Sequence, residues 1–344
     1  MKKIFTLTLC LCALGASATI WRLNNNLAVD ADFRTFAEAQ EAAEAGDTIF
    51  IEGNGLSNHY GNIITITKKL VIIGPGYFLN ENDSVSANQL PARVGSISIE
   101  ASAAGTEIYG MYIQVIASYS HLNIKASNVI VARNYCVADN NNNFILLAAN
   151  VQNVTITQNF VFQIQTASDG IIASNLLIAN NFVGNRISLN SNSNGVIVNN
   201  LLRLGLSNVH NSQIKNNIVY ESDGNGNMLS QNNSNNYIAY NLVKYGSITG
   251  VVGPGNVANV DMSEVFLGYP TQGTYSQDGS WQLKPDGPAI GAGENGIDCG
   301  MFGGSAPYKL SGIAPVPIVY KAVIPTSGST TGGLPVILKI KSMN

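Results

Sequence analysis

The chain has 344 residues, of which 11% are charged and 45% are hydrophobic, and its formal net charge is -3. A chain of this length can bury a large core, but it has no basic field and no run of like charge of the kind that binds nucleic acid. We therefore expect no nucleic-acid partner.

Residues 1–18 have the pattern of a secretory signal peptide. Two lysines precede a short apolar run, and the small residues Ala16, Ser17 and Ala18 follow it as a cleavage site. The alternative is a membrane anchor, but the apolar run is well short of the ~20 residues that a membrane-spanning helix needs. No second candidate span follows, so we predict a secreted protein, extracellular or at the cell surface, without a transmembrane segment.

Residues 19–46 are expected to form an N-terminal cap built on one helix. Thr35 and Glu38 match a capping box, and Gly46 is placed as a C-terminal stop. The apolar residues Phe33, Phe36, Ala39 and Ala43 share one helical face. Such a helix would cover the open end of a stack of strands, and a separate recognition helix is the alternative.

A phrase of ten residues then recurs, with copies that begin at Asn128, Asn153, Asn175, Asn194, Asn211 and Asn235. The steps of 25, 22, 19, 17 and 24 residues vary too much for a helical repeat and suit a coil of strands whose loops change in length. The fourth and ninth positions are apolar throughout, or cysteine once, whereas the positions between them are mostly polar. This pattern predicts strands with two inward-pointing columns.

The seventh position of the phrase is asparagine in every copy: Asn134, Asn159, Asn181, Asn200, Asn217 and Asn241. Identical amides stacked at ~4.8 Å can bond to one another, and asparagine also tolerates the left-handed backbone of a sharp bend. We therefore predict a buried asparagine ladder, with independent asparagine turns as the alternative. Pro75 and Met111 hold the equivalent place earlier in the chain, so the ladder should begin near Asn134.

With these columns, the sequence resembles the right-handed parallel β-helix proteins of the pectin lyase-like superfamily. The resemblance implies an all-β fold, a right-handed parallel β-helix solenoid over residues 47–300. From the register of the repeat we expect about eleven coils. The segment from Trp281 resembles the closing segment of secreted bacterial β-helix proteins. Residues 301–344 would then be a closing segment and β-strand tail, in which residues 318–324 and 334–341 predict a hairpin.

Two cysteines remain after the signal peptide, Cys136 and Cys299, which is too few for a disulfide framework. Cys136 lies in the ninth, inward column. We therefore predict that it is a buried free thiol near Val161 and is not bonded to Cys299.

The resemblance implies that an enzyme of this fold would place its site on the outer face of the sheet that precedes each phrase. We expect the strands of that sheet in segments that start at residues 144, 170, 186, 228 and 247. The carboxylates between residues 128 and 250 are only Asp139, Asp169, Glu221 and Asp223. Neither the aspartate cluster of a polygalacturonase-like hydrolase nor the acidic calcium site of a pectate lyase is present in this pattern.

A metal-free lyase needs only a base and a group that neutralises a uronate carboxylate. The residues that qualify are His121, Lys125, Arg133, Arg186 and His210. Their spacing does not bring them together, so solvated strand and loop positions are the alternative. Asp223, in the glycine-rich stretch DGNGN, is a weak candidate calcium ligand, and we expect no other metal site and no cofactor.

Exposed aromatic rings on a flat sheet can stack on sugars, and the candidates are Phe162, Tyr220, Tyr237 and Tyr240. The expected function is therefore that of a secreted, non-catalytic β-helix, either a surface scaffold or adhesin or a glycan-binding protein. Its partner would be an extracellular polysaccharide or a neighbouring surface protein. The alternative is a polysaccharide lyase or glycoside hydrolase that acts on an acidic polysaccharide.

Overall fold

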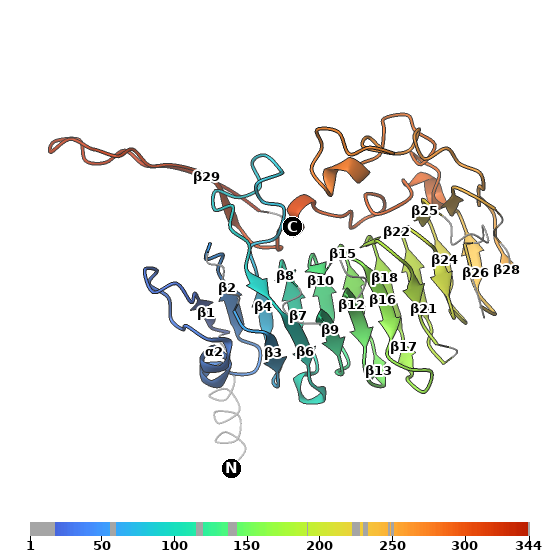
Figure 1. Cartoon of the computed structure of the whole chain (residues 1–344), viewed down its shortest axis with the longest axis horizontal. Coiled ribbons are helices and arrows are strands. Elements are labelled where there is room, and N and C mark those ends of the chain that lie inside the picture. Colours follow the sequence, from blue (N-terminus) through green and yellow to red (C-terminus); the bar gives the residue numbers. More distant parts are fainter. Residues whose placement is uncertain are drawn as a thin grey trace, which may run out of the picture.

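The computed structural model describes residues 18–55, 60–114, 120–136, 143–190, 192–221, 228–229, 233–246, 248 and 251–342, without the side chains of residues 120, 121, 143, 251 and 252. Within these residues the chain winds into a parallel β-solenoid whose strands form three long sheets (Figure 1). Sheet A has 11 strands, sheet B has 7 and sheet C has 8. The predicted all-β solenoid is confirmed.

The strands of sheet A are β1 (Ile20–Leu23), β2 (Thr48–Ile51), β4 (Val71–Ile73), β7 (Glu107–Tyr109), β10 (Ile130–Ala132), β14 (Thr155–Thr157), β18 (Leu176–Ala179), β21 (Gly195–Val198), β24 (Gln213–Lys215), β26 (Tyr237–Ala239) and β28 (Val251–Val252). Those of sheet B are β3 (Ile63–Ile66), β6 (Ser96–Ile99), β9 (Ser120–Ile124), β12 (Asn143–Leu147), β16 (Gln163–Thr166), β20 (Ile187–Ser188) and β23 (Leu206–Ser207).

The strands of sheet C are β5 (Arg93–Val94), β8 (Tyr112–Ile113), β11 (Tyr135–Cys136), β15 (Phe160–Val161), β19 (Phe182–Val183), β22 (Leu201–Leu202), β25 (Ile218–Val219) and β27 (Leu242–Val243). A short parallel pair consists of β13 (Val151–Gln152) and β17 (Ala173–Ser174). About 7 turns make up the solenoid, fewer than the eleven coils expected, although sheet A alone reaches 11 strands.

The register of the strands follows the columns of the repeat. In sheet A the fourth positions pair directly, as Val131 does with Ile156 and Ile156 with Ile178. In sheet C the ninth positions pair in the same way, as Cys136 does with Val161. Both columns are buried in the continuous core between the sheets, which explains why the apolar residues keep their register while the loops vary.

The seventh-position asparagines form a hydrogen-bonded ladder in the turn between sheets A and C. Each is 0% exposed. Each Nδ2 donates to the Oδ1 of the next asparagine, from Asn134 to Asn159 at 3.1 Å up to Asn217 to Asn241 at 3.0 Å. The same Oδ1 atoms accept backbone N–H groups, and Asn256 extends the ladder by one further step. At its start, Asn134 accepts from the N–H of Met111, so the ladder begins where expected.

The left-handed bend lies one residue earlier than predicted. The ladder asparagines do not have positive φ; the preceding, sixth position does, in Arg133, Gln158, Asn180, Asn199, Asn216 and Tyr240, with φ between 54° and 58°. Asparagine is therefore required at the seventh position for its amide rather than for its backbone. The first position of the phrase forms another left-handed bend in most copies, for example at Asn153 and Asn175.

Part of the predicted catalytic sheet lies elsewhere. The segments from residues 144 and 186 do supply β12 and β20 of sheet B, and Leu229 bridges to Leu206 in the same sheet. The segment from residue 170 instead forms β17, and β16 takes its place in sheet B, while residues 251–252 belong to sheet A. Short strands with irregular loops leave the periodicity of this sheet weak, which is why the assignment failed there.

At the N-terminal end, α2 (Phe36–Ala42), the one α-helix among the described residues, begins with the predicted capping box between Thr35 and Glu38. Phe36, Ala39 and Ala43 are at most 5% exposed and belong to the core of the first turns. The helix ends earlier than predicted: Ala43 is its C-cap in an extended conformation, and Gly46, with φ of 100°, lies in the turn before β2 rather than at the end of the helix. Strand β1, which lies within the residues predicted to form the cap, pairs with β2 and is the first strand of sheet A.

Residues 253–314, which we call the returning segment, run back along the solenoid over sheet C (Figure 1). This segment contains only the short 3₁₀ helices η2 (Gly279–Trp281), η3 (Glu294–Gly296) and η4 (Leu310–Gly312); a fourth, η1 (Ala101–Ala103), precedes β7. It covers the eighth position of the phrase, whose side chains are at most 8% exposed: Tyr135, Phe160, Phe182, Leu201, Ile218 and Leu242. Sheet C is therefore buried on both faces.

The sixth-position side chains fasten the returning segment. They donate hydrogen bonds to its backbone carbonyls in the pairs Arg133 and Ile313 (2.8 Å), Gln158 and Pro307 (2.9 Å), Asn180 and Gly303 (2.7 Å), and Asn199 and Asp298 (3.0 Å). As the residue number of the donor rises from 133 to 199, the residue number of its partner in the returning segment falls from 313 to 298. The returning segment thus runs opposite to the direction in which the coils stack. Each of these four coils holds it with one or two hydrogen bonds.

After the returning segment, β29 (Ile318–Val323) and β30 (Ile337–Lys341) form the predicted antiparallel hairpin. Cys136 and Cys299 are both free and buried, as predicted for the thiol of Cys136. Burial raises the pKa of the Cys136 thiol to about 12, and that of Cys299 to about 12, so both remain protonated near neutral pH.

Candidate functional site

A cleft of about 510 Å³, which we call the aromatic cleft, lies on the outer side of sheet C beside the returning segment. One wall is the tenth position of the phrase, which follows each sheet C strand: Phe162, Gly184, Arg203 and Tyr220. The other wall is residues 268–281 of the returning segment. The cleft therefore joins a repeated column with a part of the chain that has no repeat.

Stacked aromatic rings form the floor. Phe160 and Phe182 pair in adjacent strands, and their ring centroids are 4.0 Å apart with 13° between the planes. Tyr220 continues the row 6.2 Å from Phe182. All three side chains are at most 7% exposed, and burial raises the pKa of the Tyr220 hydroxyl, which keeps it neutral.

The returning segment adds two half-buried rings above this floor. Trp281 lies 4.6 Å from Tyr220 and 5.3 Å from Phe182, measured between ring centroids, and Tyr269 lies 6.3 Å from Trp281. The planes are tilted by 39° to 46°, so the rings surround a space rather than forming one stack. Phe162, also half-buried, lines the same cleft.

Gly184 keeps the cleft open between these rings. A Cβ at this position would lie 3.5 Å from the ring of Phe182 and 3.7 Å from that of Phe162. These are ordinary contacts, so alanine would fit, but a longer side chain would extend into the space between the rings.

Charged groups are confined to one end. Arg203 Nε donates to Glu221 Oε2 at 2.6 Å, and their side chains are 48% and 36% exposed. This hydrogen bond raises the pKa of Arg203 further. Beyond the pair, Lys244, also a tenth-position residue, donates to the Tyr269 hydroxyl at 2.6 Å, which raises the pKa of its ammonium group. The cleft thus offers a planar cation, a carboxylate and a phenol at its edge.

A second hollow of about 460 Å³ continues along the same face of sheet C. Gln277 lines both spaces, and its backbone N–H donates to Glu81 Oε2 at 2.9 Å. Tyr112 and Tyr135, with ring centroids 4.6 Å apart, form the floor of the second hollow. Tyr135 in turn stacks 6.0 Å from Phe160, so one row of rings runs beneath both spaces.

Of the four predicted aromatic residues, the structure brings two together. Phe162 and Tyr220 line the aromatic cleft. Tyr237 lies on the outer face of sheet A, 40% exposed, with Lys215 Nζ 5.3 Å above its ring. Tyr240 occupies a left-handed bend and its carbonyl accepts from Cys299 Sγ at 3.3 Å. The last two are therefore placed away from the cleft.

The predicted basic residues lie in different places. Lys125 forms an ion pair with Glu100 at 2.9 Å after β9, and His210 Nδ1 is 2.7 Å from Ser234 Oγ. Arg133 is 6% exposed beneath the returning segment, where its Nε donates to Gln158 Oε1 at 2.6 Å. Arg186 precedes β20, and His121 lies in β9, where only its backbone is described. The contacts of Lys125, Arg133 and His210 do not gather them into one site.

The candidate calcium ligand Asp223 lies outside the described residues, as does Asp139. Among the residues that the structure does describe, no group of three or more His, Cys, Asp or Glu side chains is arranged to hold a metal ion. Nor does any helix in this part of the chain combine the length and apolar character needed to cross a membrane.

Tyr269 and Trp281 could not be assigned to the cleft from the sequence, because nothing in the irregular returning segment indicates where it folds. One signal was available. The eighth and ninth positions of the phrase are both apolar, or tyrosine or cysteine, in every copy. Two adjacent apolar positions in a strand indicate burial on both faces, and hence a covering segment over sheet C.

No family model matches this chain, and a comparison with curated proteins finds no match either.

Proposed function

We propose that this chain is a secreted glycan-binding protein that holds an extracellular polysaccharide in the aromatic cleft. The observation that carries the proposal is the convergence of Phe162, Tyr269 and Trp281, all half-buried, on one open space. Aromatic rings accept the apolar face of a pyranose, while Arg203, Glu221 and amide groups at the edge can bind its hydroxyl groups.

The dimensions favour an oligosaccharide over a monosaccharide. The cleft reaches from Phe160 in β15 to Tyr220 after β25, that is, across four successive strands of sheet C. Three strand spacings of ~4.8 Å amount to ~14 Å, and a pyranose ring is about as long as one such spacing. About three sugar units would lie along the row of rings, and the second hollow offers room for a longer chain.

Binding suits the cleft better than cleavage. Glu221 is the one carboxylate among the described residues that line it, and it is paired with Arg203. Hydrolysis of a glycosidic bond generally uses two carboxyl groups on either side of the scissile bond. The resemblance to pectin lyase-like proteins is a resemblance of fold, and fold alone does not carry their activity to this chain. The predicted signal peptide supports the extracellular location of the ligand.

The test is to measure binding of soluble xylan, β-glucan, arabinogalactan, polygalacturonate and alginate by calorimetry and by tryptophan fluorescence. The chain has only two tryptophans, so a Trp21→Phe background makes Trp281 the reporter. We expect one class of glycan to bind and to change the emission of Trp281. Phe162→Ala or Arg203→Gln should weaken that binding about tenfold, which corresponds to ~1.4 kcal/mol.

Gly184→Leu should abolish binding because its side chain would fill the cleft, and Tyr237→Ala is the matched control, an aromatic residue removed outside the cleft. Equal affinity in Phe162→Ala, Gly184→Leu and the unmodified chain would show that the glycan binds elsewhere. Release of unsaturated or reducing ends that stops in Arg203→Gln would favour the lyase or hydrolase alternative.

A further inference from the structure

The C-terminal hairpin, residues 318–341, is an arm that stands away from the solenoid. Figure 1 shows it extending past the first coils, on the side of the N-terminal end. Its base is tied by two hydrogen bonds, from the N–H of Ala87 to the carbonyl of Val319 at 2.9 Å and from Lys341 Nζ to the carbonyl of Ser84 at 2.7 Å. Beyond that base, the arm is a two-stranded sheet on its own.

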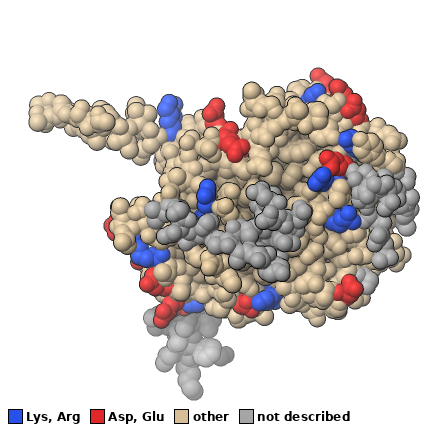
Figure 2. Space-filling model, in the orientation of Figure 1, with Lys and Arg blue, Asp and Glu red and all other residues tan. Residues whose placement is uncertain are grey.

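The two faces of the arm differ in chemistry. Val319 pairs with Ile340 and Ala322 pairs with Leu338, so these four side chains share one apolar face. Ile340 is 63% exposed and Leu338 54%. On the opposite face Lys321 pairs directly with Lys339, Lys341 follows two residues later, and the apolar pair of Val323 and Ile337 lies beside them. Residues 315–344 contain no aspartate or glutamate, and Figure 2 shows no acidic side chain on the visible side of the arm.

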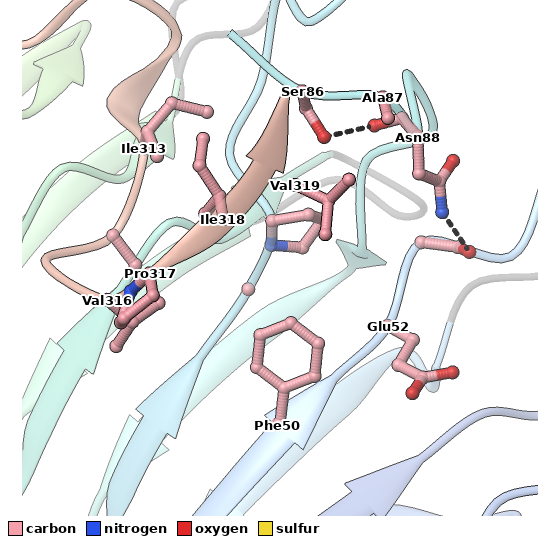
Figure 3. A pocket seen from close by; sticks show the side chains of 14 residues that line it. Phe50, Glu52, Ser86, Ala87, Asn88, Ile313, Val316, Pro317, Ile318 and Val319 are labelled. Carbon is pink, nitrogen blue, oxygen red and sulfur yellow. Dashed lines mark hydrogen bonds between the residues drawn. The ribbon is translucent and has the colours of Figure 1, made fainter. Parts of the chain in front are cut away.

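Without a partner surface, the arm is in an unfavourable state. A two-stranded hairpin is marginally stable in water unless its apolar face is covered, and like charges directly opposite each other destabilise a sheet. The base does not compensate, because a hollow of about 400 Å³ remains there between the arm and β2. Figure 3 shows Phe50, Ile318 and Val319 around this hollow. The arm therefore fits a surface that supplies both apolar contact and negative charge.

The N-terminal cap of the chain has these properties. Between residues 19 and 52, carboxylates outnumber basic residues by seven to two. The exposed ones are Asp30, Asp32, Glu38, Glu41 and Glu44. Of the two arginines, Arg22 is held by Glu52 at 2.6 Å and the guanidinium of Arg34 donates to the carbonyls of Asn24 and Asn26. Leu27 is 85% exposed and Ile20 66%, so the acidic surface also has apolar points of contact.

We propose that the arm of one copy docks on the N-terminal cap of a second copy, forming a symmetric dimer joined at the N-terminal ends of the two solenoids. The arm points beyond its own cap, so a copy that faces it end to end meets the arm with its cap and presents its own arm in return. Such a two-fold arrangement uses each surface once per chain and closes without further growth. The lysine face would meet the acidic cap, and the exposed leucine and isoleucine side chains would be covered.

The experiment is sedimentation velocity of the full secreted chain over a wide range of concentration, at low and at high salt. We expect a dimer that dissociates as salt rises, because the contact between charges is screened. The double variant Lys321→Glu with Lys339→Glu should weaken association at least about tenfold. Leu338→Ser should weaken it at any salt concentration. Lys284→Glu, which changes a lysine far from the arm, is the control and should leave the dimer intact.

A charge exchange keeps the test decisive even if one variant misfolds. Glu41→Lys with Glu44→Lys should also fail to dimerise, but mixing it with the lysine-to-glutamate arm variant should restore a mixed dimer, because each arm again meets a cap of opposite charge. A chain that stays monomeric at every concentration would overturn the proposal. So would a dimer that the arm variants leave unchanged, or an arm that binds anionic vesicles while the protein remains a monomer.

Discussion

Each coil has two turns in which asparagine recurs, and the two asparagine columns differ in exposure, in backbone conformation and in hydrogen bonding. The ladder column, at the seventh position, is 0% exposed, and each amide makes bonds to the coils on either side. The column at the first position is exposed and left-handed except at Asn194, and its side chains bond to one another only in part, as Asn175 Nδ2 does with Asn153 Oδ1 at 3.2 Å. The same amide side chain is therefore needed for stability in the ladder turn but can be replaced in the first-position turn.

Burial, rather than repetition, determines how much an asparagine column stabilises the fold. A buried amide that loses its partner leaves unpaired polar groups in the core, whereas an exposed amide exchanges its partner for water. A third asparagine in the same coil, Asn180, lies between these extremes because the returning segment covers it. Asn181, Asn180 and Asn175 thus form a series within one coil.

The largest effect is expected for Asn181→Ala. Asn181 Nδ2 donates to Asn200 Oδ1 and to the carbonyl of Ile156, both at 2.9 Å, and its Oδ1 accepts from the N–H and the Nδ2 of Asn159. Removing the amide leaves these groups unpaired in the core, so we expect a loss of about 2 to 3 kcal/mol. Denaturant unfolding followed by circular dichroism measures it. A midpoint equal to that of Asn192→Ala, outside the ladder, would mean that the ladder does not stabilise the coil.

Asn180→Gly should have an intermediate effect. Its amide donates to the carbonyls of Met301 at 3.0 Å and Gly303 at 2.7 Å, and glycine keeps the left-handed backbone, φ 55°, without strain. We expect a loss of about 1 to 2 kcal/mol and, more specifically, faster hydrogen exchange in residues 298–308 than in sheet A. Exchange that rises equally in both regions would indicate that Asn180 holds the coil itself rather than the returning segment.

The sequence was sufficient for the parts of the fold that repeat. The fourth and ninth columns indicated the core, and the asparagine column indicated the ladder and its start at Asn134, because these features recur with every coil. The left-handed residue was placed one position too late, since asparagine is common at both the sixth and the seventh positions. The position that actually bends tolerates arginine, glutamine and tyrosine, because its backbone is held by the coils above and below.

Only the wall of the aromatic cleft that belongs to the repeat could be predicted from the sequence. Phe162 and Tyr220 could be singled out because they occupy one repeated position, but Tyr269 and Trp281 come from a segment whose path depends on packing. That path is fixed by sixth-position side chains and by the apolar eighth column, two features that have meaning only once the covering segment is known. The basic residues His121, Lys125, Arg133, Arg186 and His210 had no such shared position, and no common site could be derived from them.

The smallest effect is expected for Asn175→Gly. Asn175 is exposed, with φ 52°, and glycine adopts this conformation freely, so the only loss is one hydrogen bond of 3.2 Å that water can replace. Glycine relieves the left-handed strain of asparagine but is freer in the unfolded chain, and because these two effects have opposite signs we expect the unfolding free energy to stay within about 0.5 kcal/mol of the unmodified chain. Since Asn180→Gly has the same substitution in the same backbone conformation, the difference between the two variants isolates the bonds to the returning segment. If both glycine variants lost equal stability, the cost would come from glycine in the unfolded chain, and the cover over sheet C would owe its stability to the apolar eighth column alone.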